Sequence, residues 1–171
     1  MIFLHTSDWH LGATGGERDL WDDQKYFIDA ICGIVREKNV DAVLLAGDVY
    51  DRSVPSAAAI GLYDYAMNRL CGELGVKVLI IAGNHDSAER LASCAGLLDK
   101  AGLYLQGAAQ REPRVVEFAD SQVFFLPWMT EEKIKSLYPE ERDGINGLTE
   151  AYRVAVNHMR EKFIPGKRHF L

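Results

Sequence analysis

The chain has 171 residues, of which 48% are hydrophobic and 26% are charged, as in a globular protein with one well-buried core. Its 19 lysines and arginines oppose 25 aspartates and glutamates, and the net charge of −6 excludes an overall basic surface for nucleic acid or anionic lipid. Apolar runs fall short of the roughly 18 residues of a membrane span, and the apolar start before His5 is too short for a signal peptide. We therefore expect a cytoplasmic protein without a membrane partner.

Three short apolar segments, at residues 2–6, 40–46 and 76–82, predict buried strands. Between them, apolar side chains recur at helical spacing over residues 21–35 and 56–73. In the second of these helices the predicted core face carries Ile60, Tyr63, Met67 and Leu70. Strands that alternate with helices predict a βαβαβ unit with right-handed crossovers. The expected fold class is therefore α/β, with a mostly parallel sheet flanked by helices.

The second half of the chain has a less regular pattern. Helices are expected at residues 88–100, 131–138 and 148–163, and extended pieces at residues 103–106, 114–118 and 122–127. Residues 167–171 resemble the start of another strand. Because the sequence has no internal repeat, low-complexity tract or linker, we expect one domain or part of one.

The three cysteines, Cys32, Cys71 and Cys94, are widely separated and lie among apolar residues. Their odd number and the absence of a CxxC pair argue against a disulfide framework or a zinc site. We expect them to be small buried side chains.

Metal-binding side chains follow each of the three predicted strands. The segments are Asp8-Trp9-His10, Gly47-Asp48-Val49-Tyr50-Asp51 and Gly83-Asn84-His85-Asp86. The carboxyl ends of parallel strands meet at one edge of a sheet, where open α/β folds bind their ligands. One such segment alone would more often cap a loop, but three in order predict a metal site. Carboxylate, imidazole and amide donors together favour Mn, Fe or Zn over Ca or Mg.

The residue types suggest a role for each side chain. Asp48 is the natural bridge between two ions held ~3.5–4 Å apart, because a carboxylate can give one oxygen to each. Asp8 and His10 would then bind one ion and Asn84 the other. His85 is left to meet a substrate phosphate or leaving oxygen as the catalytic residue. Either Asp51 or Asp86 would fix the tautomer of His85.

These motifs, DxH, GDxxD and GNHD, resemble those of the calcineurin-like metallophosphoesterase superfamily. Their context, HTSDWHLG, AGDVYD and AGNHDS through Arg90-Leu91, is similar to that of SbcD-type nuclease subunits. The resemblance implies a calcineurin-like sandwich with two divalent metal ions, with Mn²⁺ the expected ion. It also implies a double-stranded DNA exonuclease and single-strand endonuclease in DNA end processing and recombination. The implied partners are DNA, an SbcC-type coiled-coil ATPase and a second copy in a homodimer, with candidate faces at residues 63–74 and 92–98.

The family's later histidine and its glycine-histidine-x-histidine motif have no counterpart in this sequence. We therefore expect residues 1–171 to be the N-terminal part of a metallophosphoesterase (nuclease) domain, truncated before those motifs. Such a chain would hold metal only partially and show negligible nuclease activity. His158 and His169 have no partner at ligand spacing and are expected to be structural or surface residues.

Other residues near the motifs have weaker functional signals. Arg52 and Arg90 follow metal motifs closely and are candidate phosphate-binding residues, although Arg52 stands where some relatives have histidine. Trp9 is expected to pack and to shape the site rather than to stack on a base. Two alternatives remain open: a small-molecule phosphodiesterase or protein phosphatase of the same superfamily, and a non-catalytic scaffold or dimerisation fragment.

Overall fold

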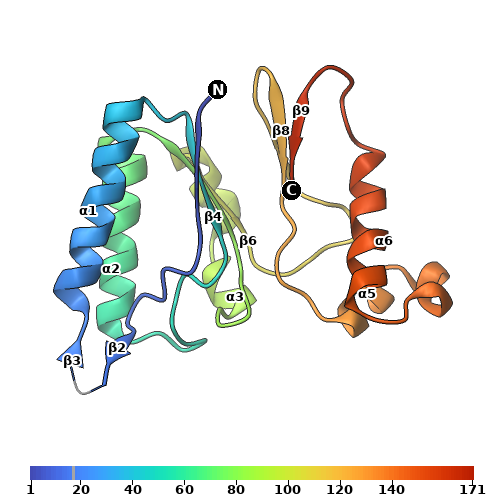
Figure 1. Cartoon of the computed structure of the whole chain (residues 1–171), viewed down its shortest axis with the longest axis horizontal. Coiled ribbons are helices and arrows are strands. Elements are labelled where there is room, and N and C mark those ends of the chain that lie inside the picture. The colour runs from blue at the N-terminus through green and yellow to red at the C-terminus, as the bar shows by residue number, and fades with distance from the viewer. Residues whose placement is uncertain (17) are drawn as a thin grey trace. The chain divides into compact units, whose positions relative to one another are not determined.

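The computed structural model describes residues 1–16 and 18–171, which form two compact units, Met1–Gly107 and Ala108–Leu171 (Figure 1). The first unit is built on a parallel four-stranded sheet in the order β1-β4-β5-β6. Its strands are β1 (Phe3–Thr6), β4 (Ala42–Ala46), β5 (Lys77–Ile81) and β6 (Leu103–Gln106). The predicted α/β fold with a parallel sheet flanked by helices is confirmed, and the extended piece at residues 103–106 joins the sheet as its fourth strand.

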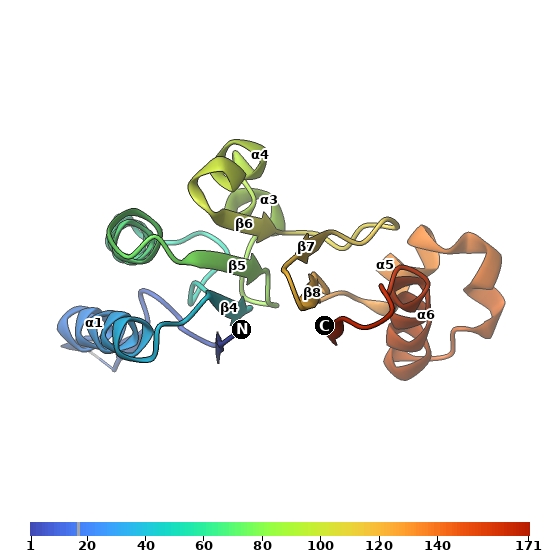
Figure 2. The ribbon, with the colours of Figure 1, turned by 90° about the horizontal axis from the view of Figure 1, so that it is seen from above.

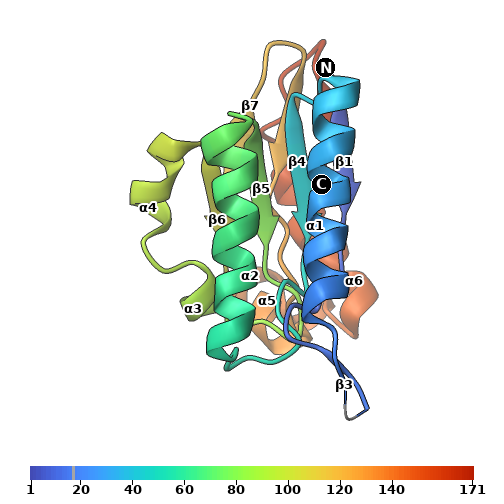
Figure 3. The same ribbon diagram turned by 90° about the vertical axis from the view of Figure 1, so that its left-hand side faces the viewer.

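Two long helices cover one face of this sheet. Figure 3 shows α1 (Trp21–Lys38) and α2 (Ala57–Met67) side by side in front of the strands. The Ser56 side chain caps α2 by accepting a hydrogen bond from the Ala59 amide at 3.2 Å. The π-helical segment η1 (Asn68–Glu73) continues α2 to the end predicted for this helix.

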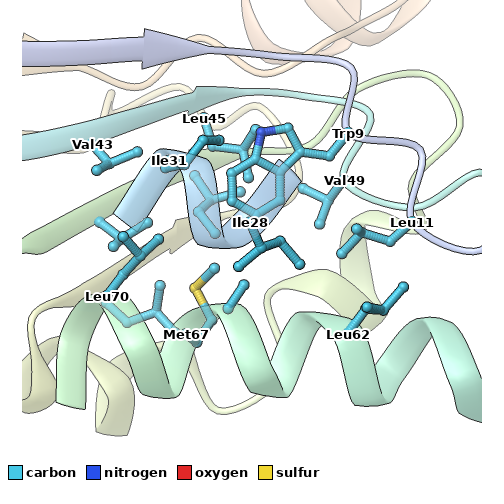
Figure 4. Packing of buried hydrophobic residues seen from close by; sticks show 14 of the residues in the cluster. Trp9, Leu11, Ile28, Ile31, Val43, Leu45, Val49, Leu62, Met67 and Leu70 are labelled. Atoms are coloured by element: carbon cyan, nitrogen blue, oxygen red, sulfur yellow. The ribbon is translucent and has the colours of Figure 1, made fainter. Parts of the chain in front are cut away.

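The core of this unit lies between the helices and the sheet. Figure 4 shows Ile28 and Ile31 of α1 packed with strand residues such as Leu45 and with Met67 and Leu70 of the second helix. Trp9 is 5% exposed, packs edge to face on Phe27, and donates its indole N–H to Thr6 Oγ1 at 3.0 Å. The prediction that Trp9 packs in the fold is therefore confirmed.

The helix expected at residues 88–100 is wrong as a single element. The chain forms α3 (Ala88–Leu91), α4 (Ala95–Leu98) and the 3₁₀ turn η2 (Asp99–Ala101), and α3 and α4 lie beside β6 (Figure 2). The interruption falls at Cys94, whose φ of 59° is left-handed and cannot continue a right-handed helix. All three cysteines are free, but only Cys32 is buried; Cys71 is half-buried and Cys94 is exposed, which corrects the expectation for those two.

The second unit has its own sheet and its own small core. Its strands β7 (Val115–Glu117), β8 (Ser121–Phe124) and β9 (Arg168–Phe170) form a sheet in that order, antiparallel between β7 and β8 and parallel between β8 and β9. Its helices are α5 (Glu131–Leu137), the 3₁₀ segment η3 (Pro139–Gly144) and α6 (Leu148–Arg160). The strands and helices predicted for this part are confirmed, with α6 ending three residues early.

The two histidines of the second unit have structural contacts. His158 stacks on Tyr138 with ring centroids 4.3 Å apart, and its Nε2 lies 2.6 Å from Glu141. His169 stacks on Phe163 and contacts the Ile164 carbonyl oxygen at 3.2 Å. The expectation that both are structural residues agrees with these contacts.

The remaining described elements are short. β2 (Thr14–Gly15) and β3 (Arg18–Asp19) form a two-stranded antiparallel ribbon before α1. None of the described helices is both long enough and apolar enough to cross a bilayer.

Candidate metal centre

The loops after β1 and β4 run side by side and are joined through their backbones. Asp8 N–H donates to the Gly47 carbonyl at 3.1 Å, and His10 N–H donates to the Asp48 carbonyl at 3.0 Å. Leu11 continues this pattern by donating to Val49 at 2.9 Å. The parallel pairing of the two strands thus extends past their ends, and it places the first two motifs next to each other.

The backbone is strained at these motifs. Among the described residues, five that are not glycine have a left-handed φ, and three of them are Asp8 (56°), His10 (42°) and Asp48 (50°). Each such residue costs about 1–3 kcal/mol and persists only where the surrounding contacts fix it. Left-handed backbone at all three predicted ligands indicates that the fold uses stability to orient these side chains.

The same three side chains converge on one point. His10 Nε2 lies 3.9 Å from Asp8 Oδ1 and 4.0 Å from Asp48 Oδ2, and one ligand atom from each residue lies within 4.8 Å of the others. A Mn or Zn ion lies roughly 2.0–2.2 Å from its nitrogen and oxygen ligands, so two ligands of one ion are at most about 4.4 Å apart. Two carboxylates and an imidazole at these separations fit a divalent ion between them.

The third motif packs against the second through two glycines. Gly47 has a φ of 88°, and a Cβ on it would come within 2.8 Å of the Gly83 Cα. Behind this contact, the Asp86 carboxylate accepts hydrogen bonds from the amides of Gly83 (2.9 Å), Tyr50 (3.0 Å) and Val49 (3.2 Å). Both oxygens of Asp86 are therefore used to fasten the two turns together.

Asp48 is oriented from both sides. Its Oδ1 accepts the His85 amide at 3.0 Å, while its Oδ2 faces His10. Its side chain is only 13% exposed, whereas that of Asp8 is 65% exposed. The carboxylate predicted to bridge two ions is thus the most enclosed and most firmly held of the acidic ligands.

His85 lies at the exposed end of the cluster. Its Nδ1 is 2.9 Å from the backbone carbonyl oxygen of Asp51, and its ring packs edge to face on His10 with centroids 4.8 Å apart. A carbonyl oxygen only accepts, so Nδ1 carries the proton and Nε2 faces away from this bond. This bond, followed by the carboxylates of Asp48 and Asp51, raises the pKa of His85 above its ordinary value. The predicted choice between the side chains of Asp51 and Asp86 was wrong, because the Asp51 main chain holds the tautomer.

Asp51 has a further contact that the sequence did not reveal. Its Oδ1 lies 3.7 Å from Nδ1 of His10, a buried nitrogen without a hydrogen-bond partner among the described residues. Asp51, His10 and His85 form a second group whose potential ligand atoms lie within 4.8 Å of one another. The carboxylate at the end of the GDxxD spacing was the available signal for this position.

The other predicted site residues are exposed. Asn84 occupies the same turn as His85, and its role as a ligand stays a prediction. The Arg52 side chain is 78% exposed, with its Nε 3.6 Å from Asp51 Oδ2, so it lies at the rim of the cluster. Arg90 lies exposed on α3. Phosphate binding by these two arginines also stays a prediction.

Comparison with known proteins agrees with this geometry. The chain is 31% identical over 162 residues to the SbcD component of the nuclease SbcCD from Staphylococcus epidermidis (strain ATCC 12228 / FDA PCI 1200). The match covers 95% of this chain and 42% of that relative's length, so the chain spans less than half of the relative. The model of the calcineurin-like phosphoesterase family matches residues 1–162, which include all three motifs. With its ligand-bearing loops at the carboxyl ends of a parallel sheet, the chain belongs to the calcineurin-like phosphoesterase family.

Proposed function

We propose that residues 1–171 are the N-terminal part of the catalytic domain of an SbcD-type DNA nuclease that hydrolyses phosphodiester bonds with Mn²⁺. The observation that carries this proposal is the convergence of Asp8, His10 and Asp48, with ligand atoms within 4.8 Å of one another. The similarity to a component of the nuclease SbcCD supports DNA over other phosphodiesters. In this proposal the protein acts in the cytoplasm as an exonuclease on duplex DNA and an endonuclease on single strands, during end processing and recombination.

Each residue of the cluster has a distinct part in the proposed reaction. Asp8 and His10 hold one ion, Asp48 presents one carboxylate oxygen to each of two ions, and Asn84 adds an amide oxygen for the second. Divalent ions bound there would neutralise phosphate oxygens and lower the pKa of a water molecule. The ring of His85 is fixed through Nδ1, so its Nε2 meets the substrate phosphate or protonates the leaving 3′ oxygen. Arg52, at the rim, is placed to contact a neighbouring phosphate.

The proposed partners are DNA, an SbcC-type coiled-coil ATPase and a second copy of the chain. The name of the S. epidermidis relative, which makes it one part of SbcCD, supports the ATPase partner. Leu97 of α4 is 71% exposed and lies within one of the two segments predicted as dimer faces, which supports a contact there.

Substrate class is tested on the full-length protein with a DNA duplex and bis(p-nitrophenyl) phosphate, each with and without Mn²⁺. We expect Mn²⁺-dependent digestion of the duplex and its loss in Asp48→Asn, with Asp64→Asn of exposed α2 as the matched control. Hydrolysis of the small phosphodiester without duplex digestion would favour a small-molecule phosphodiesterase. Absence of hydrolysis with both substrates would overturn the enzymatic proposal.

A further inference from the structure

The side-chain amide of Gln24 bridges the loop that carries the first motif. Gln24 lies in the first turns of α1 and is half-buried. Its Nε2 donates to the carbonyl oxygen of His10 at 2.7 Å, and its Oε1 accepts the amide of Gly12 at 3.0 Å. The same His10 carbonyl accepts the Ala13 amide at 2.9 Å, which closes a tight turn. One side chain from a helix therefore satisfies both free backbone groups of this turn.

The turn is held from the opposite side by α2. Gly12 has a φ of 89°, and a Cβ on it would lie 2.8 Å from the Cβ of Ala59. Gly12 thus fits between Gln24 of one helix and Ala59 of the other, with no room to move toward α2. Because both helices pack on the sheet, the turn has a fixed position relative to β1 and β4.

These contacts determine the backbone of His10. Its N–H is bound to the Asp48 carbonyl, and its own carbonyl is bound by Gln24 and Ala13. His10 has a left-handed φ of 42°, a conformation that returns to the right-handed region unless both peptide groups beside it are held. The direction of its imidazole follows from that backbone conformation.

We propose that Gln24 is a positioning residue that keeps the His10 imidazole directed at the metal centre by fixing the His10 carbonyl and the Gly12 amide together. The metal part of this inference rests on the proposed function. An amide suits the position because the loop presents one acceptor and one donor. A carboxylate keeps the acceptor for Gly12 but places an oxygen against the His10 carbonyl, and an aliphatic side chain provides neither contact.

The second unit contains a matched control. Gln122 is 2% exposed, its Oε1 accepts the Ile164 amide at 2.9 Å, and its Nε2 contacts the Lys162 carbonyl at 3.4 Å. It bridges two backbone groups of a turn as Gln24 does, but these groups belong to residues 108–171. A general effect of losing a bridging glutamine on folding is therefore measured by Gln122→Leu.

The experiment compares Gln24→Leu, Gln24→Glu and Gln122→Leu in the 171-residue chain. Without metal, NMR measures hydrogen exchange of the Gly12 amide and the ring chemical shifts of His10; Mn²⁺ affinity is then measured by titration. In Gln24→Leu we expect faster Gly12 exchange, displaced His10 shifts and Mn²⁺ binding weakened about tenfold. Gln24→Glu should keep the Gly12 protection and still displace His10. Gln122→Leu should alter none of these readouts.

Unchanged Gly12 exchange and His10 shifts in a folded Gln24→Leu chain would overturn the inference. If that variant does not fold, unchanged His10 shifts in Gln24→Glu would overturn it equally. Failure of the unaltered chain to bind Mn²⁺ would count against the proposed function alone, because the metal-free readouts still decide the role of Gln24.

Discussion

Gly83 lies so close to Asp48 that a β-carbon on the glycine would overlap the aspartate carboxylate and its backbone amide. The carboxylate therefore occupies the space that a side chain at position 83 would need. Asp48 can present its outer oxygen to His10 only because residue 83 has no Cβ.

Gly83→Ala should displace the Asp48 carboxylate and weaken Mn²⁺ binding, while overpacking destabilises the chain by about 1–3 kcal/mol. Gly33→Ala is the control, because a Cβ at Gly33 of α1 would meet no atom within 4 Å. That control should bind Mn²⁺ as the unaltered chain does, with equal or higher stability in urea. Equal Mn²⁺ affinities of the two variants would contradict the steric argument.

Asp48→Asn and His85→Ala should lose activity by orders of magnitude in the full-length protein for different reasons. Removing the charge of the bridging ligand should weaken Mn²⁺ binding by about 100-fold or more, whereas His85→Ala should leave affinity nearly unchanged because His85 acts on the substrate. Calorimetric titration separates the two effects, and His158→Ala in the second unit serves as a control. Equal loss of metal in both variants would contradict the role given to His85.

Asp86→Ala should destabilise the chain by about 2–3 kcal/mol, because it leaves three backbone amides without their charged acceptor. Asp86→Asn keeps one acceptor oxygen and should cost less. Urea unfolding at pH 7 measures both, against Asp64→Ala on the exposed side of α2. A stability of Asp86→Ala equal to that of the Asp64 variant would show that the carboxylate does not fasten the two turns.

Asp29 gives a pH-dependent contribution to stability. The Tyr65 hydroxyl donates to its Oδ1 at 2.6 Å and Arg69 at 2.7 Å, and these contacts, the Tyr65 bond first, lower the pKa of Asp29. A carboxyl whose pKa is lower in the folded state stabilises the fold above its unfolded pKa and loses this effect as the pH falls through its folded pKa. Asp29→Asn should therefore be less stable than the unaltered chain at pH 7, with the difference shrinking below about pH 4.

Urea unfolding at pH 7 and pH 3 checks this expectation. The tyrosine and arginine should be retained in both proteins, so that only the charge of residue 29 differs. A stability difference of the same size at both pH values would mean that ionisation of Asp29 contributes nothing.

The strands of the first unit could be predicted because each is a short apolar run that is buried in the sheet. The register of helical faces was less secure: Ile60 was predicted in the core but is 51% exposed, while the neighbouring Ala59 and Leu62 are buried. Small residues such as Ala59 give little periodic signal, although they permit the closest packing. The break at Cys94 depends on one backbone dihedral and leaves no mark in composition.

The metal centre could be predicted as far as its side chains follow strands. Asp8, His10 and Asp48 were found because parallel strands bring their carboxyl ends together. The tautomer of His85 depends on the main-chain oxygen of Asp51, and the turn at His10 depends on Gln24, fourteen residues away. Contacts to backbone atoms carry no signature in residue type, so the sequence could not identify them.

The sheet order β1-β4-β5-β6 follows the order of the strands along the chain, so each new strand joins an edge already present when it leaves the ribosome. Each strand after β1 pairs with the strand that precedes it in the sheet, without waiting for a distant segment. The loops bearing Asp8 and Asp48 can therefore meet once β4 and its loop have emerged, well before residues 108–171 are synthesised. We expect the metal-binding edge to take shape early during translation, with later residues added to an arrangement that already exists.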